Sequence, residues 1–144
     1  MSMPPSPETQ AVWTTLIQAA DGARNQVESA LADASLPPLS WYDALLEIER
    51  AGPTGLRAYE LKDRLLMPQY GTSRLLARIE GAGLILRKAC NDDARGQIIT
   101  LTEKGAETRR RMWPVYANAM ESAIGSKLKP VQLGRLNRLL GKLL

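Results

Sequence analysis

The chain has 144 residues, 44% of them hydrophobic, which is enough for a domain with its own apolar core. It contains no histidine and one cysteine, Cys90, which excludes Ser-His-Asp and Cys-His catalytic sites as well as an internal disulfide. We therefore expect no enzymatic activity, no cofactor and no bound metal. No apolar run is long enough for a membrane helix, and the polar first ten residues lack a signal-peptide pattern, so a cytoplasmic location is predicted.

Charge is distributed unevenly along the chain, although the net charge is only +4. Residues 1–50 carry two basic and seven acidic side chains, a net charge of −5. Residues 51–144 carry seventeen basic and eight acidic side chains, a net charge of +9. A local excess of positive charge favours a polyanionic partner such as nucleic acid. The alternative is a basic surface that only confers solubility.

Two helices are predicted in the first third of the chain. Ser6–Pro7–Glu8 is typical of a helix start, and apolar residues then recur at helical spacing as far as Ala34. A second helix is expected over residues 41–51, ending at a Gly-Pro pair. Ser40 is predicted to cap this helix, with Asp43 in the capping-box position.

A third and a fourth helix are predicted over residues 58–66 and 69–82. The fourth is amphipathic. Gly71 is expected in its first turn, where a glycine costs roughly 1 kcal/mol of helix propensity. The apolar stripe consists of Leu75, Leu76, Ile79 and Ala82, and the other side presents Tyr70, Ser73, Arg74, Ala77 and Arg78.

Two short strands, 84–90 and 97–101, are predicted to form a hairpin. Three helices followed by a hairpin is the order of a winged helix-turn-helix, so residues 36–102 are predicted to form a DNA-binding domain. In such a domain the fourth helix of this chain would enter the major groove, with the hairpin tip beside the neighbouring minor groove. Arg95 at the tip would enter that narrow groove, and Asp93 would hold its guanidinium in place.

The two ends of the chain are predicted to be helical. Thr102 is expected to cap a long helix over residues 103–124, and an amphipathic helix follows over 129–144. The apolar stripes of the terminal segments have too little core to cover within one small winged helix. Residues 1–35 and 103–144 are therefore predicted to pair between chains as a dimerisation region.

The segment Arg74–Gly105, RLLARIEGAGLILRKACNDDARGQIITLTEKG, strongly resembles the MarR family of bacterial transcriptional regulators. The matching motifs are Gly83–Leu84–Ile85 at a strand, Asp93–Ala94–Arg95 in the wing, and Leu101–Thr102–Glu103–Lys104–Gly105 at the long helix. The region from Leu36 onwards is also similar, so the resemblance covers most of residues 36–120.

The resemblance implies a mainly α protein with a small β-hairpin wing, in which the N- and C-terminal helices form a homodimer. It also implies a cytoplasmic repressor that binds a pseudo-palindromic operator in double-stranded DNA. A small aromatic or phenolic ligand, bound between the dimerisation and DNA-binding parts, would release it. The sequence departs from the family at Pro68–Gln69–Tyr70–Gly71, where a polar cap is usual, so base specificity is not transferred. It also lacks the N-terminal cysteine of the oxidant-sensing branch and the histidines of the zinc-sensing branch.

The candidate site residues fall into two sets. The first is predicted to contact DNA, with an ordinary exposed helix face or turn as the alternative. The second is predicted to line a ligand pocket, with a core or dimer-interface role as the alternative. The DNA set is Gln69, Tyr70, Thr72, Ser73, Arg74, Arg78, Lys88, Asp93 and Arg95, and the ligand set is Trp13, Trp41, Tyr42, Trp113 and Tyr116.

Some residues and functions are left with open alternatives. Arg87 is a further candidate for phosphate contact, and Arg78 has an ion pair inside the domain as its alternative. For Arg109–Arg110–Arg111 a solvated helix face is favoured over DNA contact, and for Cys90 an unreactive strand position is favoured over redox sensing. The alternative functions are an effector-independent or activating DNA-binding regulator, and a dimeric protein-interaction module that uses the winged helix.

Overall fold

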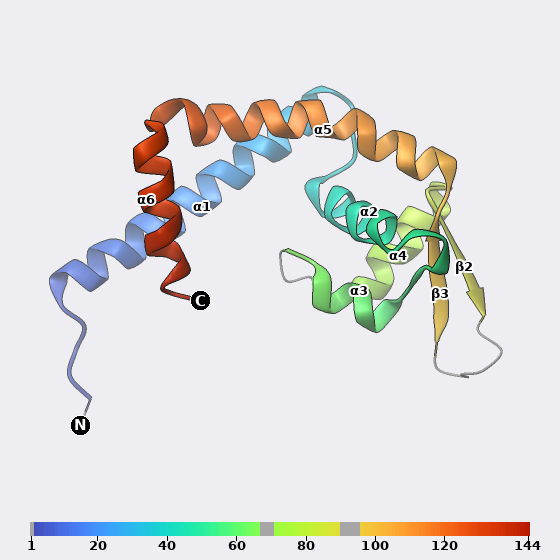
Figure 1. Ribbon diagram of the computed structural model, residues 1–144, viewed down its shortest axis with the longest axis horizontal. Helices are drawn as coiled ribbons and strands as arrows, with labels where there is room; N and C mark the ends of the chain where they lie inside the picture. The colour runs from blue at the N-terminus through green and yellow to red at the C-terminus, as the bar shows by residue number, and fades with distance from the viewer. Residues whose placement is uncertain (1, 67–70, 90–95) are drawn as a thin grey trace. The chain divides into compact units, whose positions relative to one another are not determined.

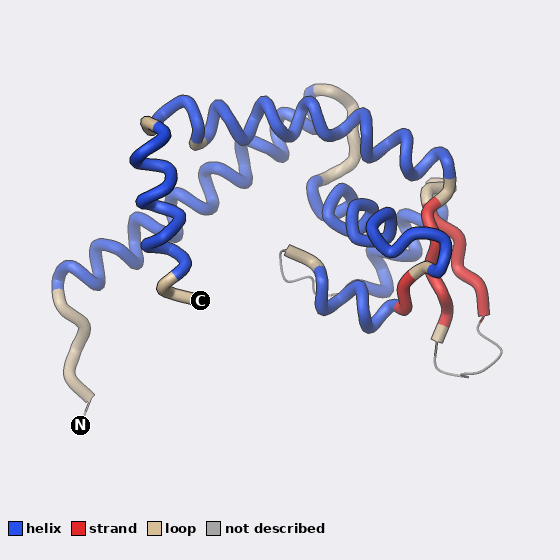
Figure 2. The backbone as a smooth tube through the Cα atoms, viewed as in Figure 1, coloured by secondary structure: helices blue, strands red, loops and turns tan. Residues whose placement is uncertain are grey.

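The structure is a computed structural model that describes residues 2–66, 71–89 and 96–144 (Figure 1). It is mainly α-helical with a small antiparallel sheet, as predicted. The helices are α1 (Pro7–Asp33), α2 (Leu39–Ala51), α3 (Ala58–Arg64), α4 (Thr72–Gly81), α5 (Glu103–Ala123) and α6 (Pro130–Gly141), with short 3-10 helices η1 (Gly52–Thr54) and η2 (Gly125–Lys127). The strands are β1 (Leu56–Arg57), β2 (Ile85–Ala89) and β3 (Gln97–Leu101) (Figure 2).

The chain divides into two compact units. Residues 1–30 and 115–144 form one, which we call the helical unit, and residues 31–114 form the other, the winged-helix unit. The core of the winged-helix unit is built from α2, α3, α4 and the sheet. Its fully buried side chains include Leu45, Ile48, Leu61, Ile79 and Ile99. Each such aliphatic side chain contributes about 1.5–3 kcal/mol when it leaves water.

The sheet has the strand order β1-β3-β2, with both neighbouring pairs antiparallel. In the predicted hairpin, Ile85 pairs with Leu101 and Ala89 pairs with Gln97. The third strand, β1, was not predicted from the sequence. Its Leu56 pairs with Ile99. A strand of two residues is too short to show an alternating pattern in the sequence. Its formation depends on pairing with β3.

Local signals predicted some helix ends and missed others. The Ser6 hydroxyl accepts a hydrogen bond from Thr9 N–H at 3.1 Å, and the Thr102 hydroxyl accepts one from Gly105 N–H at 3.0 Å, which confirms both predicted caps. The predicted capping of α2 is wrong, because that helix begins at Leu39 and already contains Ser40 and Asp43. Gly71 is also not in the first turn of α4. It precedes the helix in the left-handed region, with φ 81° and ψ 48°, where glycine is favoured.

The helical unit leaves much of its apolar surface exposed. Trp13 in α1 is 69% exposed, and in α6 no residue is buried. Exposed apolar side chains of α6 include Val131, Leu136 and Leu139. None of the helices in the described ranges combines the length and apolar character needed to cross a membrane.

Candidate nucleic-acid interface

Helix α4 has one face in the core and one in solvent. Leu75, Leu76 and Ile79 are buried, as their spacing predicted, because residues three and four apart share a helix face. Ser73, Arg74 and Arg78 are exposed. Within residues 2–66, 71–89 and 96–144, neither arginine forms an ion pair or a hydrogen bond through its side chain, so the structure does not bear out the internal pair considered for Arg78. Among the residues that the structure describes, both guanidinium groups are therefore without an acidic partner.

The start of α4 is fixed by Gly71. Its carbonyl accepts hydrogen bonds from the N–H groups of Arg74 at 3.0 Å and Leu75 at 3.2 Å. The next residue, Thr72, is only partly exposed, and its hydroxyl oxygen is buried. Ser73 and Arg74 are therefore the first side chains of the described helix that point into solvent.

Strand β2 carries two adjacent basic residues with different surroundings. Lys88 is exposed. Arg87 donates two hydrogen bonds to one carboxylate oxygen of Glu80 in α4, from Nη2 at 2.7 Å and from Nε at 3.1 Å. The charge of Arg87 is therefore balanced by Glu80 inside the domain, and its contact with phosphate stays a prediction.

The pair also changes the titration of its members. The hydrogen bond from Arg87 lowers the pKa of Glu80, and the same contact raises the pKa of Arg87. A lowered carboxylate pKa stabilises the fold above the group's ordinary pKa of 4.5. That contribution is lost as the pH falls through the lower folded-state value. At neutral pH the pair therefore stays ionised.

Several predicted contact residues lie outside the described residues. These are Gln69 and Tyr70 before α4, and Asp93 and Arg95 in the hairpin connection; Cys90 also lies there. Their roles stay predictions.

Basic residues near the sheet and in α3 were not singled out from the sequence. The Arg57 guanidinium lies against the backbone at Gly96, where an added Cβ would be 3.2 Å from Arg57 Cζ. The backbone N–H of Arg57 donates a hydrogen bond to the Glu60 carboxylate at 3.2 Å. Arg57 thus joins the start of α3 to the base of the hairpin. Lys62 of α3 is exposed and adds positive charge. The first helix of a helix-turn-helix crosses the DNA backbone, which is the signal that could have identified Lys62.

Two of the predicted ligand residues lie together in the winged-helix unit. The rings of Tyr42 in α2 and Trp113 in α5 stack with centroids 6.1 Å apart and an interplanar angle of 22°. Tyr42 is only 6% exposed, whereas Trp113 is 46% exposed, so the stack has one buried and one accessible side. Trp41 is half-buried against the core. Trp13 and Tyr116 belong to the helical unit.

The arginine run of α5 is divided in its contacts. Arg109 forms an ion pair with Glu49 of α2. Arg110 and Arg111 are exposed, as favoured from the sequence. The ion pair ties the first part of α5 to α2 within the winged-helix unit.

Helix α4 packs with α2 and α3, presents a basic face to solvent and is followed by a hairpin. This arrangement defines a winged helix-turn-helix protein. Residues 35–96 match the family model described as MarR family. An uncharacterised HTH-type transcriptional regulator of Bacillus cereus is 31% identical over 103 residues, which are 72% of this chain and 66% of that relative. The match therefore spans slightly less than two thirds of the relative's length.

Solved structures agree with this assignment over nearly the whole chain. The MarR family regulator Sco3205 from Streptomyces coelicolor, in complex with DNA, is 27% identical with a TM-score of 0.87, covering 99% of this chain and 89% of that one. A MarR family protein of Mycobacterium tuberculosis, in complex with salicylic acid, is 25% identical with a TM-score of 0.66, covering 90% and 93%. The chain belongs to the MarR family of transcriptional regulators.

Proposed function

We propose that this protein is a cytoplasmic transcriptional regulator that binds a pseudo-palindromic operator as a homodimer. The observation that carries the proposal is the exposed face of α4, where Arg74 and Arg78 have no acidic partner among the described residues. A helix of this kind fits the major groove, where its first residues reach base edges. Lys88 on the hairpin adds positive charge, and the DNA complex of Sco3205 supports DNA as the partner.

Selection of bound duplexes from a random pool tests this function. A two-fold symmetric dimer should enrich an inverted repeat with half-sites about one helical turn apart. If no duplex binds at low salt, the alternative becomes a protein-interaction module that uses the same fold.

Dimerisation is supported by the exposed apolar surface of α1 and α6. Burial of such surface contributes roughly 25 cal/mol per Å², which favours pairing of two copies. We expect sedimentation of the wild type at micromolar concentration to give twice the chain mass of 15.8 kDa. Val131→Glu combined with Leu139→Glu should give a monomer, because each would place a charge in an apolar contact. Arg135→Glu on the same helix is the control and should remain a dimer; a monomeric wild type would contradict the proposal.

Release from the operator by a small aromatic ligand is the second part of the proposal. The Tyr42–Trp113 stack offers an aromatic surface with one accessible side, and the salicylic acid complex of the Mycobacterium tuberculosis protein supports an effector of this class. Release of this kind makes repression the simplest regulatory output. The runner-up is an effector-independent or activating regulator.

Titration with salicylate and other small aromatic acids separates these two. We expect operator release together with a raised melting temperature, because a ligand that binds the folded state stabilises it. Trp113→Ala should weaken the response about tenfold or more while operator binding without ligand is retained. Trp13→Ala, measured in the same way, tests a predicted ligand residue that lies in the helical unit. A broad panel without any response would favour the effector-independent regulator.

A further inference from the structure

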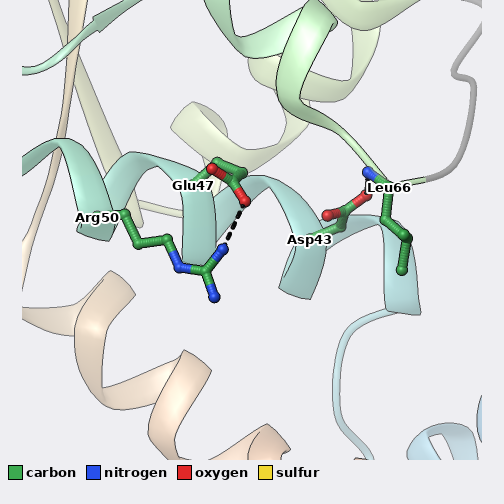
Figure 3. A network of polar contacts seen from close by, with 4 residues as sticks. All are labelled: Asp43, Glu47, Arg50 and Leu66. Carbon is green, nitrogen blue, oxygen red and sulfur yellow. Dashed lines mark hydrogen bonds and ion pairs between the residues drawn. The ribbon is translucent and has the colours of Figure 1, made fainter.

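Asp43 is a buried carboxylate in the middle of α2, only 9% exposed. Its Oδ2 accepts a hydrogen bond from the backbone N–H of Leu66 at 2.8 Å (Figure 3). Burying a carboxylate is unfavourable unless its oxygens are hydrogen-bonded, and an apolar side chain would fill this position without that penalty. The residue therefore calls for an explanation beyond packing.

The hydrogen bond holds the chain where it leaves α3. The Leu65 N–H makes the last helical bond, to the Leu61 carbonyl at 3.2 Å, and Leu65 itself has extended backbone angles of −65° and 134°. The next N–H, that of Leu66, is the one taken by Asp43. The Leu66 side chain is 76% exposed, so apolar burial does not fix this point.

We propose that Asp43 is a positioning residue for α4. It holds the beginning of the connection to that helix, while Gly71 in its left-handed conformation sets the end. The side chains that α4 presents to DNA must keep a fixed orientation to read base edges, and a loosened connection would relax it. The inference rests on the proposed function of α4 as the DNA-reading helix.

Helix α2 also provides a matched control. Glu47, one turn after Asp43, pairs with Arg50 of the same helix at 3.0 Å (Figure 3). The Glu47 side chain is 14% exposed, and in the described residues it forms no hydrogen bond or ion pair with α3. Removing Glu47 takes a carboxylate from the same helix without touching the connection to α4.

The test compares Asp43→Ala, Asp43→Asn and Glu47→Ala for operator affinity at a temperature where each variant is fully folded. Asp43→Ala should lose about tenfold in affinity, the size of one hydrogen bond to a charged group. It should also discriminate less between operators with base changes in the major groove. Asp43→Asn keeps an oxygen acceptor for the Leu66 N–H and should restore most of both properties. Glu47→Ala should match the wild type.

A second variant removes the donor instead of the acceptor. Leu66→Pro lacks the N–H, and the extended angles of Leu65 already suit a residue before proline. If both changes act through one hydrogen bond, Leu66→Pro should reproduce the loss of discrimination, and the double variant should lose little more than either single one. If Asp43→Ala does not fold, Leu66→Pro alone still tests the role of this hydrogen bond.

The outcomes are distinguishable. A wild type that binds no duplex overturns the proposed function. A wild type that binds, with folded Asp43→Ala or Leu66→Pro equal to it in affinity and base discrimination, overturns only the positioning role. Lower melting temperatures with unchanged discrimination would likewise show that the hydrogen bond only stabilises the fold.

Discussion

Raising the NaCl concentration from about 50 mM to about 200 mM should weaken operator binding by roughly 10⁴-fold. Arg74, Arg78 and Lys88 are exposed without acidic partners in the described ranges, and Arg95 is predicted at the hairpin tip. A dimer would then bring about eight cations to phosphate, which predicts a slope near −7 in a plot of log K against log salt concentration. Fluorescence anisotropy across a salt series measures this slope, and affinity that barely changes with salt would contradict it.

The same experiment can compare an unpaired with a paired basic residue, because Lys88 and Arg87 are neighbours in β2. Lys88→Ala should reduce the steepness of the slope by about two, because a dimer loses two phosphate contacts. Arg87→Ala should leave the slope nearly unchanged, because Glu80 already neutralises this guanidinium. Equal changes for the two variants would show that the Arg87–Glu80 pair opens on DNA.

The elements that the sequence predicted well are those whose signal is local. Leu75, Leu76 and Ile79 of α4 are buried as their helical spacing indicated, and the hairpin pairs where two β-rich runs were expected. The Ser6 and Thr102 caps were also predicted, because a capping hydroxyl and the N–H it binds lie three residues apart.

Features that depend on distant partners could not be predicted in the same way. Asp43 fits a local capping box, yet its carboxylate binds Leu66, 23 residues later. Arg87 and Lys88 look equivalent in sequence, and only the approach of α4 to β2 shows which of them meets Glu80. The sequence thus indicated a basic site, whereas only the fold shows which of its charges are already paired.

Strand β1 is the clearest example of a feature that depends on a distant partner, because it forms only by pairing with β3. The two strands approach closely at Gly55. Gly55, directly before β1, has φ 75° and ψ −175°, which only glycine adopts without strain. A Cβ there would lie 2.5 Å from Ile98 Cγ2 and 2.6 Å from the Ile99 carbonyl oxygen. Gly52 has similar angles, φ 68° and ψ −157°, but a Cβ on it would meet nothing within 4 Å. The two glycines thus share the backbone strain and differ in the space around them.

Gly55→Ala should therefore destabilise the protein by about 4 kcal/mol, which combines backbone strain of roughly 1–3 kcal/mol with a similar cost of overpacking. Gly52→Ala should cost only the strain, about 1–3 kcal/mol. Urea unfolding followed by circular dichroism gives both free energies, and Gly55→Ala should also lower the melting temperature by about 10 °C or more. Because β1 pairs with β3, the clash at Gly55 would displace β3, which is one of the two strands of the hairpin. Equal losses for the two variants would mean that β1 can move away from β3 at no cost, and the sheet would then not depend on that contact.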